Sequence, residues 1–237
     1  MNRVPGLRRA PARITGGGLL PLALALLLPL ATSACGGGLK YTIDDAALDA
    51  IPPGDRANVF EAGKELEIAT SEHRAAVSQL EALDRDTDIA SKEKEQARLE
   101  IEKAVAEQEG AKASRDENQA NAAAHNKDVA DMGLKVSEAK LEWLEQKQEW
   151  LKQNRVASEA HIQEAKARIE LEKAKVAQQK GMKPSSDFQV SDYESQWKSK
   201  NSDWESEKKD ATSEEKDTKK KEQQWRDLQT QYQKTKG

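Results

Sequence analysis

Cysteine is almost absent from this 237-residue sequence, which contains only Cys35. Aromatic residues make up 4% of the chain and charged residues 34%, which is too little apolar material for a thick globular core. The apolar stretch from Leu19 to Ala31 is too short to cross about 30 Å of hydrocarbon as a helix. The sequence therefore argues against a disulfide framework, against a large globular enzyme and against a membrane-spanning helix.

The N-terminus has the pattern of a secretory signal. Four arginines and no acidic residue precede the apolar stretch, and small residues follow it. A basic region, a short apolar region and a small-residue site typify a cleavable signal peptide, here residues 1–34. Cleavage would remove four arginines and no acid, which moves the formal net charge from −4 to −8. An acidic chain offers no electrostatic case for binding nucleic acid.

The residues Thr32-Ser33-Ala34-Cys35 resemble a bacterial lipobox, in which cleavage occurs before a cysteine that carries diacylglycerol. The resemblance covers about the first 36 residues and implies that Cys35 is lipidated, with no other cofactor. It also implies that Gly36 to Gly38 act as a tether. Because Gly36 stands where an Asp would favour the inner membrane, an outer-membrane lipoprotein on the periplasmic side is expected. The alternative is an incidental cysteine after an ordinary secretory signal.

Proline and glycine divide the rest of the chain. Thr42 to Asp45 has the form of a capping box for one short helix, and Asp55 could cap a long helix that has no proline until Pro184. Alanine, Glu, Lys, Gln and Leu are abundant, as in coiled coils. The predicted fold is therefore all-α, in four segments: a lipidated tether with a short helix at 35–54, a long coiled-coil segment at 55–180, a linker at 181–190 and an amphipathic helix at 191–237.

Heptad spacing in the long segment predicts packing against another helix. Positions seven apart from Ala62 to Ala111 are all alanine except Leu83, and a parallel column from Val59 to Ile101 includes His73, Thr87 and Lys94. After Gly133 a different frame begins, and the two frames do not join. An antiparallel hairpin with its tip within 112–133, near Asp116 to Asn118, explains the break. One continuous rod with a phase shift, completed by self-association, is the alternative.

Aromatic residues in the second half recur at heptad spacing. Trp197, Trp204 and Trp225 share a column with Val190 and Tyr232, which favours burial against another helix. This column is expected to dock either on Trp143 and Trp150 of the same chain or on a partner. The same residues are candidates for binding a partner or a sugar. The candidate partner-binding residues are Trp143, Trp150, Tyr193, Trp197, Trp204, Trp225 and Tyr232.

No group of residues has the spacing of a catalytic or metal site. His73, His125 and His161 are scattered without paired metal-ligand spacing, and no small-molecule substrate is evident. Two hypotheses follow. The first is a membrane-anchored lipoprotein that acts as a scaffold, spacer or adaptor in the bacterial envelope, by self-association or with a protein partner. The second is a lipoprotein that binds cell-wall carbohydrate or is tethered to peptidoglycan, although Lys236 is penultimate rather than terminal. Neither is an enzyme.

Overall fold

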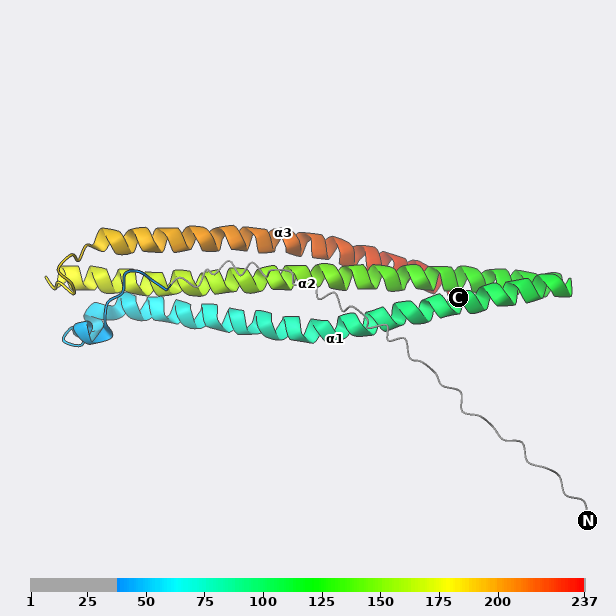
Figure 1. The fold of residues 1–237 in the computed structure, drawn as a ribbon, viewed down its shortest axis with the longest axis horizontal. Helices are drawn as coiled ribbons and strands as arrows, with labels where there is room; N and C mark the ends of the chain where they lie inside the picture. The colour runs from blue at the N-terminus through cyan, green and yellow to red at the C-terminus, as the bar shows by residue number, and fades with distance from the viewer. Residues whose placement is uncertain (1–37, 237) are drawn as a thin grey trace, which may run out of the picture. The chain divides into compact units, whose positions relative to one another are not determined.

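The described part of this computed structural model, residues 38–236, is built from helices alone (Figure 1). Two short 3₁₀ helices, η1 (Asp45–Leu48) and η2 (Pro53–Arg56), precede three long α-helices. These are α1 (Ala57–Ser114), α2 (Glu117–Gln179) and α3 (Val190–Lys236). The all-α prediction is confirmed. The predicted signal peptide and Cys35 lie outside the described residues.

Helices α1 and α2 form the antiparallel hairpin, so the continuous-rod alternative is wrong. The turn consists of Arg115, in the left-handed conformation with φ 59°, and Asp116. The Asp116 carboxylate caps α2 by accepting hydrogen bonds from the backbone N–H groups of Asn118 (2.9 Å) and Gln119 (3.2 Å). A two-residue turn with an Asp cap explains why no proline or Asn-Gly marks the tip.

The hairpin is held together by the alanine column of α1 that the sequence predicted and by a matching column of α2. Every member of the α1 column is buried, and the matching α2 column is buried at Ala123, Ala130, Leu144, Leu151, Ser158 and Ala165. The α2 column thus begins at Ala123, ten residues before the frame expected after Gly133. Alanine on both sides lets the two backbones approach closely, which leaves little room for large side chains. Leu83, Leu144 and Leu151 form an apolar cluster within the seam, together with Ala90.

Polar residues beside the seam set the register of the hairpin. His73 Nδ1 lies 3.1 Å from the Ser158 hydroxyl, and Lys94 pairs with Glu138 at 3.5 Å. Thr87 turns its hydroxyl to the carbonyl of Leu83 at 3.0 Å and so needs no partner on α2. Further pairs across the hairpin, each fitting one antiparallel register, are Glu93–Lys140, Asp84–Gln148, Glu72–His161, Glu65–Arg168 and Asp55–Lys180.

Helix α3 packs antiparallel on α2, which lies between α1 and α3 (Figure 1). It ends partway along the hairpin, where the Tyr232 ring packs against Gly133. A Cβ atom added at Gly133 would lie 3.6 Å from this ring. We call the end where α2 leads into α3 the base, and the end at Arg115 and Asp116 the tip. Beyond Gly133 the tip consists of α1 and α2 only, whereas the base has three helices.

Residues 39–56, here called the strap, pack across α2 at the base. The short helix expected within 35–54 is η1, but the packing of this segment on α2 was not anticipated. Gln196 of α3 donates to the Tyr41 carbonyl and accepts from its N–H, both at 2.9 Å. Ile43, Leu48 and Ile51 are buried in one apolar cluster with α2 and Tyr193. The two caps predicted nearby were wrong. Asp44 rather than Thr42 caps η1, and Asp55 pairs with Lys180 instead of capping α1.

Candidate functional site

The aromatic residues chosen from the sequence lie mainly between α2 and α3. Trp143 of α2 and Trp225 of α3 stack with ring centroids 4.8 Å apart and planes 5° from parallel. Trp225 Nε1 is buried and has no hydrogen-bond partner among the described residues. This stack covers one face of each indole, so in this arrangement neither of those two faces is available to a sugar ring.

A second stack joins all three helices. His161 of α2 lies 4.2 Å from Trp204 of α3, with planes 6° apart, and its Nδ1 atom is 2.9 Å from the Glu72 carboxylate of α1. The Lys208 ammonium lies over the Trp204 ring, 4.7 Å from the ring centroid. The histidine that the sequence left as a scattered residue therefore connects α1 to α3 through α2. Positions seven apart through His161 are polar or glycine, so no heptad pattern in the sequence pointed to that role.

The remaining aromatic candidates are also held inside the chain. Trp197 donates from Nε1 to the Glu164 carboxylate at 2.7 Å, and Trp150 packs against the Leu83 and Leu151 cluster. Tyr193 is 5% exposed and donates to the carbonyl of Thr42 at 3.4 Å. The seven candidates thus join the parts of one chain. Their binding to an external partner stays a prediction.

Between α1 and α3, a groove of about 450 Å³ runs over α2. Trp150, His161 and Trp204 contribute aromatic surface to it, and Ala76 and Ala157 lie at its bottom. Both walls carry polar and charged side chains, among them Glu72 and Lys208, so the groove is mixed in character. It is open along its length and has no concentration of one charge.

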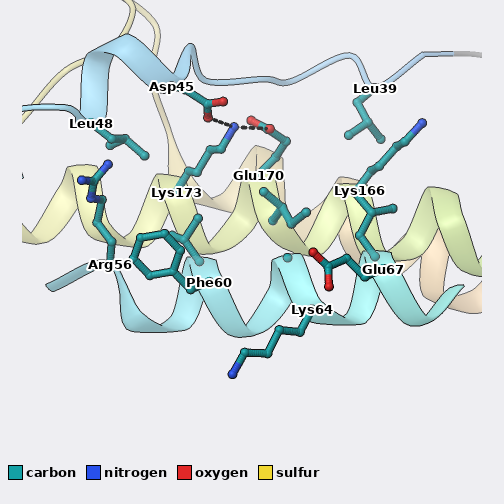
Figure 2. A pocket seen from close by; sticks show the side chains of 14 residues that line it. Leu39, Asp45, Leu48, Arg56, Phe60, Lys64, Glu67, Lys166, Glu170 and Lys173 are labelled. Carbon is teal, nitrogen blue, oxygen red and sulfur yellow. Dashed lines mark hydrogen bonds and ion pairs between the residues drawn. The ribbon is translucent and has the colours of Figure 1, made fainter. Parts of the chain in front are cut away.

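A larger cleft of about 830 Å³ lies at the base, where the strap crosses α1 and α2 (Figure 2). We call it the base cleft. Its size is within the roughly 300–1,000 Å³ of ordinary ligand pockets. The apolar side chains that line it come from all three elements: Leu39, Leu48, Val59, Phe60, Leu66 and Ile169. Sequence reasoning missed this cleft because it took residues 35–54 as a tether, which has no wall to contribute.

One wall of the base cleft contains an ion network in which Lys173 and Glu170 are buried and Asp45 is exposed. The Lys173 ammonium lies 2.6 Å from Asp45 of the strap and 2.8 Å from Glu170, and it donates to the Ile43 carbonyl at 3.2 Å. Glu170 also accepts from the Ile43 N–H at 2.6 Å. Burial lowers the pKa of Lys173, but the hydrogen bonds to Asp45 and Glu170 outweigh burial, so this pKa is raised. The network fastens the strap to α2.

The described residues contain neither a metal site nor a membrane-spanning helix. Within residues 38–236, no three His, Cys, Asp or Glu side chains gather in a way that could hold an ion. No helix in this same range combines the length and the apolar character needed to cross a bilayer.

Comparison with known proteins gives no match: neither a protein-family model, nor a curated protein, nor a solved structure matches the chain.

Proposed function

We propose that this protein is a lipid-anchored helical spacer or adaptor of the bacterial envelope, which carries an interaction surface at its tip. The observation that supports the proposal best is the difference between its two ends. The strap, which directly follows the predicted anchor, is fixed to α2 and α3, while the tip projects past α3 as a two-helix arm. Such a chain holds its tip at a defined distance from its attachment point.

The dimensions suit a spacer. At 1.5 Å per residue, the 58 residues of α1 extend about 87 Å. The 17 residues from Glu117 to Gly133 account for about 25 Å of tip beyond α3. Cys35 precedes Leu39 by four residues, and four extended residues reach at most about 14 Å. A lipid on Cys35 would therefore hold the base, and not the tip, close to the membrane.

The cell-wall alternative is less well supported. It needs exposed aromatic faces for sugar stacking, and Trp143, Trp204 and Trp225 each have a ring face covered by another ring of the same chain. Sedimentation of the purified protein with cell-wall fragments tests this alternative. Binding that survives in Trp197→Ala plus Trp204→Ala would have to use other residues.

The anchor is tested by substituting Cys35. In the bacterium that makes the protein, a clickable fatty acid should label the unsubstituted chain but not Cys35→Ser, and Cys35→Ser should move from the membrane pellet to the soluble fraction. Ser33→Ala provides a matched control, because it changes the same short stretch and keeps the thiol. Equal labelling of Cys35→Ser would contradict the lipoprotein proposal.

The spacer role is tested by shortening the tip. Deleting residues 104–110 together with residues 123–129 removes one heptad from each arm, keeps the seam in phase and shortens the tip by about 10 Å. A photocrosslinking residue at Asn121, which is exposed near the tip, should lose its envelope partner in the shortened chain. Deleting residues 104–110 alone breaks the register and shows the effect of disruption. If Asn121 crosslinks no protein even in the full-length chain, the tip is not the interaction surface.

A further inference from the structure

The base cleft is open on the apolar side of α1. Phe60 is 53% exposed although it lines the cleft (Figure 2), and Val59 is another apolar residue of α1 in the lining. Leaving a large aromatic side chain this exposed gives up apolar burial at about 25 cal/mol per Å². The protein thus keeps an apolar surface free inside a concave site, where an apolar ligand would cover it.

Gly63 keeps the floor of the cleft empty. It lies within α1, where glycine costs about 1 kcal/mol relative to alanine, and a Cβ at this position would meet nothing within 4 Å. No close backbone contact therefore requires glycine here. Its effect on the structure is to enlarge the space between Phe60 and Leu66.

Four basic residues line the cleft: Arg56, Lys64, Lys166 and Lys173. Lys64 pairs with Glu61 and Lys173 with Glu170, whereas Arg56 lies next to the exposed Phe60 ring. Arg56 Nε is buried and has no hydrogen-bond partner among the described residues, and the guanidinium lies 5.9 Å from the Phe60 ring centroid. In Figure 2 the Arg56 side chain stands between Leu48 and Phe60. The acids on the opposite wall, Asp45 and Glu170, are already bonded to Lys173. An arginine whose buried nitrogen lacks a partner favours an anionic group from a ligand.

We propose that the base cleft binds an acyl chain that bears an anionic head group, with the chain along Val59, Phe60 and Ile169 and the head group at Arg56. A fatty acid and an anionic phospholipid share this chemistry. The site is independent of what the tip binds, and it needs no catalytic step. It would add a noncovalent lipid contact at the base of the molecule.

The test places a photoreactive benzoylphenylalanine at Phe60 in the full-length chain, purified in a neutral maltoside detergent. The matched control carries it at Ile89, which is equally exposed, at 53%, on the same helix but outside the cleft. Each protein is irradiated with palmitoyl lysophosphatidylglycerol, palmitoyl lysophosphatidylcholine or palmitic acid, and adducts are counted by mass spectrometry. Both phospholipids carry a phosphate that can accept from Arg56, but only the zwitterionic one has a choline cation that repels the guanidinium. The Phe60 variant should therefore favour the anionic phospholipid by about tenfold.

Two further variants separate the head group from the chain. Arg56→Gln should abolish the preference for the anionic lipid but keep adducts, whereas Gly63→Leu should reduce adducts with all three probes. Gly110→Leu is the control, because a Cβ at this glycine of α1 also meets nothing within 4 Å; it should change neither the lipid preference nor the number of adducts. Palmitic acid and the anionic phospholipid labelling equally would show that any anionic head suffices, while a difference identifies the preferred source.

A second readout avoids substituting Phe60. The anionic phospholipid should raise the thermal unfolding midpoint of the unsubstituted chain and leave that of Gly63→Leu unchanged. The proposal is overturned if Phe60 and Ile89 give equal adducts, if Gly63→Leu labels like the parent, or if the only adduct joins position 60 to the chain's own acyl group.

Discussion

The base and the tip of this protein use opposite kinds of packing. At the base, α2 is covered by α1, α3 and the strap, so that even Glu170 and Lys173 are buried. At the tip, the buried residues between α1 and α2 are all alanines: Ala104, Ala111, Ala123 and Ala130. The comparison shows that one pair of helices can pack in two ways. At the base, apolar and ionic contacts hold α1 and α2 together, whereas at the tip the two backbones approach closely and bury little side-chain surface.

The largest difference between the two ends should come from the ion network. Glu170→Ala leaves the Ile43 N–H without an acceptor and leaves Lys173 with the solvent-exposed Asp45 as its only charged partner, so it should cost about 2–4 kcal/mol of unfolding free energy. Glu107→Ala, an exposed carboxylate near the tip, should cost less than about 0.5 kcal/mol. Urea unfolding followed by circular dichroism measures both. Equal costs would show that the base is not the more firmly held end.

The alanine seam should resist larger side chains. Ala104→Leu places three extra carbons where the two backbones are close, so it should cost about 1–3 kcal/mol and loosen the tip. Glu102→Leu, exposed on the same helix, serves as the control and should be nearly neutral. Urea unfolding gives the free energies, and amide hydrogen exchange shows whether the loss is confined to the tip. A stabilised Ala104→Leu would mean that the seam contains space.

Alkaline pH should weaken the base before the tip. The pKa of Lys173 is raised above its ordinary 10.5, so its contribution is complete below that value and is lost as pH rises through the higher, folded pKa. Burial and nearby acids, chiefly Glu170, also raise the pKa of Tyr193, and the folded protein loses stability in the same direction. The urea midpoint should therefore fall more steeply above about pH 10.5 in the parent than in Lys173→Gln. Parallel curves for the two proteins would exclude this assignment.

The smallest effect is expected for ion pairs on the surface of the tip. Lys103 lies 3.8 Å from Glu107, and its side chain is 78% exposed. Lys103→Ala should therefore change the free energy of unfolding by about 0.2–0.5 kcal/mol, and salt should reduce the difference further. Urea unfolding at low and high salt measures this. A change above 1 kcal/mol would mean that tip stability rests on charges rather than on the alanine seam.

Heptad spacing predicted the helical seams well. The alanine column of α1, the break between two frames and the inward face of α3 all follow from residues repeating every seventh position, which is a local property. Trp197 and Trp225 could therefore be placed on a packing face, with Trp143 and Trp150 or an external protein as alternative partners, but the sequence could not choose between these alternatives. Stacking of Trp225 on Trp143 depends on how α3 is positioned along α2, and no repeat records that position.

The strap could not be predicted in the same way. Its contacts join Tyr41 to Gln196 and Ile43 to Glu170, more than 120 positions apart in the sequence. Glycines 36–38 and a short helix suggested a tether, whereas three apolar side chains, Ile43, Leu48 and Ile51, bury the segment. The spacing of these three residues matches neither the period of a helix nor that of a strand, so the sequence did not indicate that they are buried. The base cleft depends on the strap and was missed with it.

The most direct test of the anchored-spacer proposal is energy transfer from each end of the acylated protein to acceptor lipids in reconstituted vesicles. Ser186→Cys places a donor dye in the α2–α3 loop at the base, and Asn121→Cys places the dye near the tip. Because Cys35 is acylated, each new cysteine is the only free thiol in its variant. We predict strong transfer from position 186 and weak transfer from position 121, because the hairpin separates the two ends by roughly 80–90 Å. Equal transfer from both positions, or transfer from neither, would contradict an anchored rod that holds its tip away from the membrane.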